Sequence, residues 1–192
     1  MSRRLIYVVG PSGAGKDSLL LWLRQHTPDS ARVHWARRTI DRPNSTEPGA
    51  ENHESVDAAG FERLLANAEL AMHWDANTHR YGIRQSELTQ LSDSDGCVIV
   101  NGSRAHLPMV ARDYPGLTVL HITATPAVLR ERLLARGRES VQAVEARMLR
   151  HIALDIPAGC ALVEIGNDST LDEAGQQLLA KLRTLGLWPV NR

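Results

Sequence analysis

The stretch Gly10-Pro-Ser-Gly-Ala-Gly-Lys-Asp17 decides the fold, because its spacing of glycines and lysine is typical of a phosphate-binding loop. It follows the apolar, β-branched run 5–9 and precedes the segment 18–25, whose composition favours a helix. Its glycines allow the backbone N–H groups to turn inward, and the following helix adds the positive end of its dipole. Lys16 can then reach the β- and γ-phosphates of a nucleotide. The sequence therefore predicts a strand, a nucleotide-binding loop and a helix, rather than a chance glycine-rich connection.

One residue of this loop departs from the usual pattern. The residue after the lysine is ordinarily Ser or Thr, whose hydroxyl ligates Mg²⁺, but here it is Asp17. A carboxylate is also a hard oxygen ligand, directly or through water. It adds negative charge beside a polyphosphate, so it makes sense mainly with a metal ion present. Ser18 carries a hydroxyl one residue later, but helix geometry rotates it away from the loop.

Composition narrows the class of protein. The chain has 192 residues, enough for one domain with or without a lid, and its 22 basic residues balance its 22 acidic ones. Nothing in this balance suggests nucleic acid or an anionic membrane as a partner. Cys97 and Cys160 lie in apolar runs without metal-ligand spacing, as expected of thiols in a reducing compartment. No apolar run reaches membrane-spanning length, and the first is too short for a signal peptide. We therefore expect a cytoplasmic protein with small-molecule substrates; a homodimer is compatible with the sequence.

Predicted strands alternate with predicted helices along the whole chain. This alternation predicts an α/β fold of the P-loop NTPase type, with a five-stranded parallel sheet covered by helices on both faces. The fully apolar run 97–100 is typical of a central parallel strand. The five strands are expected at 5–9, 31–36, 97–100, 117–123 and 161–165, and the last helix at 171–185.

Two regions are expected to lie outside this core. The core comprises 1–36, 94–125 and 155–192, the acceptor-binding region 37–93, and an arginine-rich helical lid 126–154. Within the acceptor-binding region we expect a helix from Asp57 to about residue 68, a short strand at 70–74, an irregular segment at 75–83 and a helix at 84–91.

Arginines cluster at two places in the sequence. Arg37, Arg38 and Arg42 follow a predicted strand and precede a loop, which indicates an anion site, although a solvated basic patch remains an alternative. The predicted lid helices carry the second group, in which any single arginine could instead be a surface residue. This second group consists of Arg130, Arg132, Arg136, Arg138, Arg147 and Arg150.

With these features in place, the chain resembles the guanylate kinase group of nucleoside monophosphate kinases. Its particular variants are most similar to the ribose 1,5-bisphosphate phosphokinases, the guanylate-kinase-like enzymes of bacterial phosphonate breakdown. The stretches that carry the resemblance are Gly10–Leu20, Glu51–His53, Tyr81-Gly82, Val100–Pro108 and Arg136–Glu139. They span nearly the full chain, and Asn101-Gly-Ser-Arg-Ala-His-Leu-Pro108 is the most specific.

The departures from guanylate kinases concern the acceptor. Those enzymes use tyrosines and a glutamate to hydrogen-bond guanine, but segment 50–59 has no tyrosine and the glutamate position holds Met72 or His73. Selectivity for guanine depends on such polar partners, whereas the arginines for an acceptor phosphate are retained. Guanylate kinases also usually have an aspartate where this chain has Asn101. We interpret Asp17 and Asn101 as a relocation of one negative charge around Mg²⁺.

The resemblance implies transfer of a phosphoryl group from ATP, with Mg²⁺, to ribose 1,5-bisphosphate, giving phosphoribosyl diphosphate and ADP. It also implies roles for individual residues. The donor-binding residues are expected to be Gly10, Pro11, Ser12, Gly13, Ala14, Gly15, Lys16, Asp17, Ser18, Asn167 and Asp168. The acceptor-binding residues are expected to be Arg38, Arg42, His53, Tyr81, Arg84, Asn101, Ser103 and Arg104. The catalytic residues are expected to be Lys16, Arg132, Arg136, Arg138 and Arg147, and the metal ligands Asp17 and Asn101.

Three alternatives remain open from the sequence. The first is a guanylate kinase or another nucleoside monophosphate kinase, and the second is a kinase for another small molecule such as a sugar acid. The third is a non-catalytic module like the guanylate-kinase-like domains of scaffold proteins. The intact Gly15-Lys16 and the arginine-rich lid argue against this third class, which commonly loses its phosphate loop.

Overall fold

The computed structural model describes most of the chain, and all structural statements refer to these residues. They are 5–28, 32–43, 52–76, 78–92, 96–135, 137, 140–149 and 154–188.

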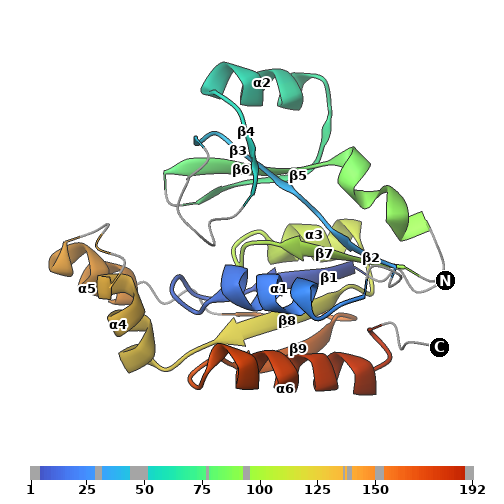
Figure 1. Cartoon of the computed structure of the whole chain (residues 1–192). Helices are drawn as coiled ribbons and strands as arrows, with labels where there is room; N and C mark the ends of the chain where they lie inside the picture. Colours follow the sequence, from blue (N-terminus) through green and yellow to red (C-terminus); the bar gives the residue numbers. More distant parts are fainter. Residues whose placement is uncertain are drawn as a thin grey trace.

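A five-stranded parallel sheet forms the core of the molecule (Figure 1). Its strand order is β2-β7-β1-β8-β9, and every neighbouring pair is parallel, as the strand–helix alternation predicts. The fold class expected from the sequence is therefore confirmed. The strands are β1 (Leu5–Val9), β2 (Val33–Trp35), β7 (Cys97–Asn101), β8 (Thr118–Thr123) and β9 (Ala161–Gly166).

Helices cover both faces of this sheet. On one face, α1 (Lys16–Gln25) and α6 (Leu171–Thr184) pack against alternate residues of the strands, such as Ile6 and Val8 of β1. On the other face, α3 (Leu107–Asp113) packs against the residues between them, such as Tyr7 and Val9. The three central strands β1, β7 and β8 are buried on both sides, which explains why these segments read as continuous apolar runs.

A second, four-stranded sheet lies over the face that carries α3 (Figure 1). Its order is β4-β3-β6-β5, and α2 (Ala58–Ala66) lies on the far side of it from the core. Asp57 caps α2 by accepting a hydrogen bond from the N–H of Gly60 at 2.6 Å, as expected. The strands are β3 (Arg38–Ile40), β4 (Glu54–Ser55), β5 (Leu70–Ala76) and β6 (His79–Arg84).

This second sheet corrects the sequence-based expectation for segment 75–83. The segment was expected to be irregular, but it ends β5 and forms most of β6, which pair antiparallel. Tyr81 and Ile83 face the core, whereas Arg80 lies on the other face of the sheet. The inward residues are separated by polar ones, so the period-two pattern is weak in the sequence. Where a helix was expected at 84–91, Arg84 ends β6 and the 3₁₀ helix η1 (Gln85–Ser92) follows.

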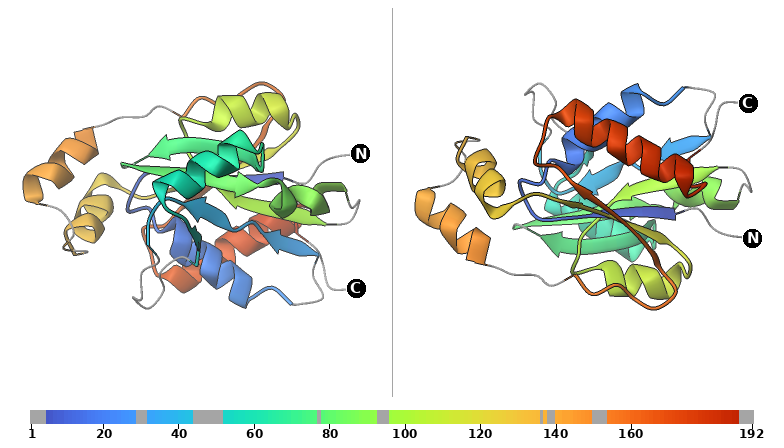
Figure 2. Two further views of the ribbon diagram at one scale, coloured as in Figure 1. Left: turned by 90° about the horizontal axis from the view of Figure 1, so that it is seen from above. Right: turned by 90° about the horizontal axis from the view of Figure 1, so that it is seen from below.

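The two remaining α-helices in the described part of the chain lie at one end of the core sheet. α4 (Pro126–Ala135) and α5 (Val141–Leu149) project beyond the carboxyl ends of the parallel strands, next to the loop after β1 (Figure 2). This is the edge at which parallel α/β sheets bind ligands. None of the helices in the described ranges is long and apolar enough to span a membrane.

Candidate active site

The phosphate-binding loop connects β1 to α1, as predicted. Gly15 precedes α1 with a φ of +80°, a left-handed conformation that glycine adopts readily. The ammonium of Lys16 donates hydrogen bonds to the carbonyls of Gly10 at 3.0 Å and Pro11 at 3.2 Å. It therefore lies across the loop, where the phosphates of a nucleotide would enter.

Two side chains from distant elements meet at Gly15. Asn167, which follows β9, is buried and donates a hydrogen bond from Nδ2 to the carbonyl of Ala14 at 2.8 Å. Arg132 reaches the same place from α4, and a Cβ on Gly15 would overlap Asn167 and lie 3.7 Å from a guanidinium nitrogen of Arg132. That nitrogen and Oδ1 of Asn167 are both buried without a hydrogen-bond partner among the described residues. Arg132 is thus placed to meet a group bound in the loop.

The predicted nucleotide residues after β9 have structural partners. Nδ2 of Asn167 is hydrogen-bonded to the phosphate-binding loop, and Asp168 accepts a hydrogen bond from the N–H of Thr125 at 2.5 Å, just before α4. The two side chains therefore fix the loop and the start of α4. Contact with adenine stays a prediction for both of them.

Asp17 and Asn101 are in direct contact, although 84 residues separate them in the chain. Nδ2 of Asn101 donates to Oδ1 of Asp17 at 2.5 Å, and the guanidinium of Arg38 lies 3.6 Å from the same oxygen. This donation fixes the orientation of the amide, because the reverse orientation would set two acceptor oxygens against each other. Oδ1 of Asn101 is then left buried without a partner among the described residues.

The side-chain oxygens of Asp17 and Asn101 are suitable ligands for a magnesium ion that binds together with a nucleotide. Asp17 is about half exposed, at 51 %, and presents a carboxylate oxygen. Oδ1 of Asn101 adds a neutral oxygen acceptor, and both are the hard ligands that Mg²⁺ prefers. The described residues contain no cluster of three or more His, Cys, Asp or Glu side chains that could hold a metal alone. Phosphate oxygens and water would have to complete the coordination.

In the predicted acceptor-binding region, Arg38 lies between the second sheet and the start of α1. It starts β3, and its guanidinium carbon lies 5.3 Å above the ring centre of Tyr81 on β6. Tyr81 stacks in turn on Trp74 of β5, with ring centres 5.7 Å apart and an interplanar angle of 5°. Both rings are more than nine-tenths buried, so they hold the guanidinium in place beside Asp17.

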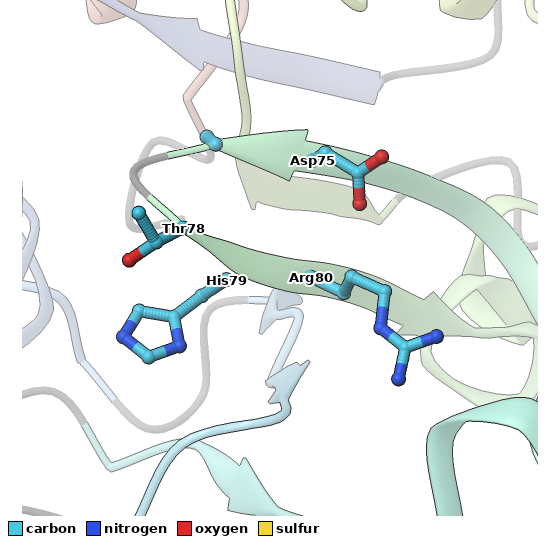
Figure 3. A pocket seen from close by; sticks show the side chains of 5 residues that line it. Asp75, Thr78, His79 and Arg80 are labelled. Atoms are coloured by element: carbon cyan, nitrogen blue, oxygen red, sulfur yellow. The ribbon is translucent and has the colours of Figure 1, made fainter. Parts of the chain in front are cut away.

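A hollow of about 430 Å³ opens at the turn between β5 and β6 (Figure 3). It is lined by Asp75, Ala76, Thr78, His79 and Arg80. The donors of Arg80 are occupied by Asp41 at 3.0 Å, Glu62 at 2.5 Å and the carbonyl of Ala58 at 3.0 Å. We therefore do not assign the acceptor to this hollow.

Comparison with known proteins decides the family. The family model for guanylate kinase matches residues 2–182. Ribose 1,5-bisphosphate phosphokinase PhnN of Burkholderia mallei (strain SAVP1) is 41% identical over 184 residues, 96% of this chain and 97% of that protein. The protein of the same name from Thiobacillus denitrificans is 41% identical and covers 93% of this chain and 92% of its own length. The chain belongs to the guanylate kinase family.

Within the guanylate kinase family, the chain groups with the proteins named ribose 1,5-bisphosphate phosphokinase. It is therefore a kinase, which transfers a phosphoryl group from a nucleotide donor. A bifunctional ribose 1,5-bisphosphokinase-thymidine phosphorylase of Azorhizobium caulinodans is 37% identical over 92% of this chain, which spans 25% of that protein. The crystal structure of guanylate kinase from Anaplasma phagocytophilum has a TM-score of 0.63 at 16% identity, over 94% of this chain and 85% of that one, and supports the fold.

Arg84, which the family resemblance places at the acceptor, has partners within the second sheet and its surroundings. Its guanidinium forms two hydrogen bonds with Glu54, at 2.7 and 2.6 Å, and a third with Glu69 at 2.5 Å. This arrangement lowers the pKa of Glu54 and raises that of Arg84, chiefly through the hydrogen bonds between them. Because three of its five N–H donors already bind these carboxylates, Arg84 stabilises the second sheet, and its contact with the acceptor stays a prediction.

His53 also has a structural partner. Its side chain is 1% exposed, and Nε2 is 2.9 Å from the backbone carbonyl of Arg42. It fixes the backbone at Arg42, which is half-buried, and its own contact with the acceptor stays a prediction. Arg42 itself therefore stays an acceptor prediction.

The turn after β7 holds the other predicted acceptor residues of this kinase. The N–H of Ser103 donates to the hydroxyl of Tyr7 at 3.0 Å. Arg104 is half-buried, and burial lowers its pKa. Arg136 and Arg138 of the predicted lid lie outside the described residues, as does the side chain of Arg147.

Sequence reasoning missed three residues that lie together between the two sheets: Tyr7, Trp74 and His106. Tyr7 lies in the middle of an apolar strand, and Trp74 lies in a predicted strand, so both looked like ordinary core residues. His106 lies in the run Asn101–Pro108, which was the most specific part of the resemblance and the available signal.

Proposed function

We propose that this kinase transfers the γ-phosphoryl group of ATP to the 1-phosphate of ribose 1,5-bisphosphate, giving 5-phosphoribosyl 1-diphosphate and ADP. The observation that carries the proposal is the position of Arg38, a phosphate-binding side chain held 3.6 Å from the metal-side carboxylate of Asp17. The names of the relatives at 41% identity, which span nearly the whole chain, support the choice of acceptor.

The donor would bind along Gly10–Lys16. Lys16 would exchange its contacts with the loop carbonyls for contacts with the β- and γ-phosphates. Asp17 and Asn101 would hold Mg²⁺, which when bound neutralises charge on the phosphates. Asn167 would keep the loop in shape through its bond to Ala14.

The acceptor phosphate would bind Arg38. An oxygen of the 1-phosphate attacks the γ-phosphorus, the bond to the β–γ bridging oxygen breaks, and ADP leaves with that electron pair. The attacking oxygen is already anionic, so the reaction needs no strong general base. The protein contributes alignment and charge stabilisation.

A lid would close over the reacting groups. We assign this role to region 126–154, with Arg132, Arg136, Arg138 and Arg147 meeting the transferred phosphoryl group and excluding water. The contact of Arg132 with the loop supports this assignment. Region 37–93 would be the acceptor-binding region, and the remaining segments the core.

The site offers little to recognise guanine. Of the two residues at the glutamate position, Met72 is 3% exposed and apolar, and His73 is exposed. Neither is an anion that could pair with the N–H groups of guanine.

Both cysteines are free, in keeping with the reducing cytoplasm that we expect. A homodimer stays a prediction.

A comparison of acceptors tests the proposal. ADP release with ATP and Mg²⁺ should be fast with ribose 1,5-bisphosphate and at least about a hundredfold slower with GMP, because polar partners for the base are missing. Lys16→Ala should lower the rate of ADP release by about a hundredfold or more while leaving the fold intact. This variant serves as the blank. Preferential use of GMP would replace the proposal with a guanylate kinase activity.

A further inference from the structure

Six side chains, each from a different element or loop, form a ring of successive contacts between the two sheets, which we call the contact ring. Its members, in order, are Asp17, Arg38, Tyr81, Trp74, His106 and Tyr7. The ring closes through the backbone after β7, because the hydroxyl of Tyr7 accepts from the N–H of Ser103, two residues from the Asn101 that binds Asp17.

The two halves of the contact ring differ in chemistry. Next to Asp17, the guanidinium of Arg38 provides a fixed positive charge for a phosphate. On the opposite side, the hydroxyl of Tyr7 and the imidazole of His106 are polar groups that can both donate and accept hydrogen bonds. A buried oxygen without a partner among the described residues, Oδ1 of Asn101, belongs to the last residue of β7, just before the segment that carries His106. A ligand with phosphate at one end and hydroxyls beside it matches this distribution.

The imidazole ring of His106 is held in position by its neighbours and keeps one nitrogen available for a further hydrogen bond. Its ring stacks on Trp74 with centres 5.4 Å apart, and Nδ1 lies 3.5 Å from the hydroxyl of Tyr7, at the outer limit of a hydrogen bond. Tyr7 is fixed tightly, because a Cβ on Gly102 would overlap its ring. Among the described residues, Nε2 of His106 forms no hydrogen bond. Trp74 and Tyr7 thus orient an imidazole that keeps hydrogen-bonding capacity.

The charge state of His106 favours a hydroxyl over a phosphate as its partner. Burial lowers the pKa of His106, the neighbouring His73 lowers it further, and Asp113 opposes the shift. The imidazole is therefore neutral at pH 7, with one donor and one acceptor nitrogen. A neutral imidazole gains little from a phosphate, whereas it matches a hydroxyl, which also donates and accepts.

We propose that His106 is a specificity-determining residue that hydrogen-bonds a ring hydroxyl of the pentose acceptor, while Arg38 binds its phosphate. The inference rests on the proposed function, because it names the part of the acceptor that His106 recognises. It explains why a histidine of this kinase stacks on a tryptophan at the junction of the two sheets, where a purely structural contact would need no polar atoms.

Paired analogues of the acceptor test this inference. The steady-state kcat/KM would be measured for wild type and His106→Ala with ribose 1,5-bisphosphate and with its 2-deoxy and 3-deoxy analogues. His106→Ala should lose about tenfold with the ribose compound, the value of one hydrogen bond of about 1.4 kcal/mol. With one of the two deoxy analogues the wild type should lose a similar factor, and His106→Ala should then lose nothing more, because the bond is already absent. His106→Gln should recover part of the loss.

The controls separate this inference from its alternatives. His121→Ala removes a histidine that pairs with Glu164 at 3.1 Å outside the contact ring, and should leave kcat/KM unchanged for all three acceptors. Thermal unfolding and ATP binding establish that the variants fold. Equal losses by His106→Ala with all three acceptors would assign the residue to structure alone and overturn the inference. Failure of wild type to use ribose 1,5-bisphosphate would instead contradict the proposed function.

Discussion

At the scale of single residues, the site depends on where one negative charge lies. The loop has Asp17 in place of a hydroxyl residue, and the end of β7 has Asn101 in place of the aspartate of guanylate kinases. The sequence suggested that the two changes compensate, and the structure brings the side chains to 2.5 Å of each other. The effects of mutating two residues in direct contact are expected to be non-additive.

We predict that Asp17→Ser and Asn101→Asp each weaken the binding of Mg²⁺ with ATP. The first removes negative charge, and the second sets two carboxylates against each other. The double variant should recover part of the loss, with a coupling of roughly 0.5–3 kcal/mol. Calorimetric titration of Mg·ATP into the four proteins measures this, and strictly additive losses would mean that the two positions do not share the ion.

Two arginines that looked equivalent in the sequence should separate by experiment. Arg38→Met should lower kcat/KM for the acceptor by about tenfold or more with little effect on stability, because it removes a phosphate contact. Arg84→Met should instead lower the free energy of unfolding by about 1–2 kcal/mol, since it breaks a partly exposed pair with Glu54 and Glu69. Kinetics and urea denaturation of both variants decide the assignment; an acceptor effect of the same size in Arg84→Met would restore the original expectation.

At the scale of elements, the strand–loop–helix unit was predictable because its signals are local. Glycine spacing, an apolar run and one lysine sufficed to place β1, the loop and α1. The strand expected at 70–74 lies within β5, but its partner β6 was missed because their pairing depends on the core beneath, and the inward residues Met72, Trp74 and Tyr81 alternate with polar ones. The partners of Arg84 and His53 come from other strands or turns, so the sequence alone did not show them.

The helix α4 carries a prediction of its own. Arg132 projects from α4 to Gly15, and one of its nitrogens is buried without a partner among the described residues. Arg132→Ala should therefore lower kcat by more than it weakens ATP binding, because the guanidinium is poised for the transferred group. An increase in the dissociation constant of ATP alone, measured by calorimetry, would reassign Arg132 to ground-state binding of the nucleotide.

At the scale of the whole molecule, the two sheets share one hydrophobic cluster. Met72, Trp74 and Tyr81 of the second sheet pack with Tyr7 and Val100 of the core. Glu87 of η1 adds a polar connection, because it accepts from Nε2 of His34 at 2.7 Å and from the N–H of Arg37 at 2.9 Å. The second sheet is thus held against the core by packing that no single segment of the sequence reveals.

The pair between Glu54 and Arg84 makes the stability of the molecule depend on pH. The folded pKa of Glu54 is lowered by its hydrogen bonds with Arg84, so its contribution is complete above the ordinary glutamate pKa of about 4.3. It is lost as the pH falls through the lower, folded pKa. The free energy of unfolding should therefore fall more steeply below about pH 5 in wild type than in Glu54→Gln. Parallel curves from urea denaturation would contradict this account.

³¹P nuclear magnetic resonance of the complete reaction tests the identity of the chemical step most directly. The protein would be mixed with ATP, Mg²⁺ and ribose 1,5-bisphosphate, with Lys16→Ala as the matched blank. We predict that the resonance of the sugar 1-phosphate is replaced by a pair of coupled diphosphate resonances, in step with the conversion of ATP to ADP, while the 5-phosphate resonance remains. Loss of ATP with release of inorganic phosphate and an unchanged 1-phosphate resonance would contradict the account.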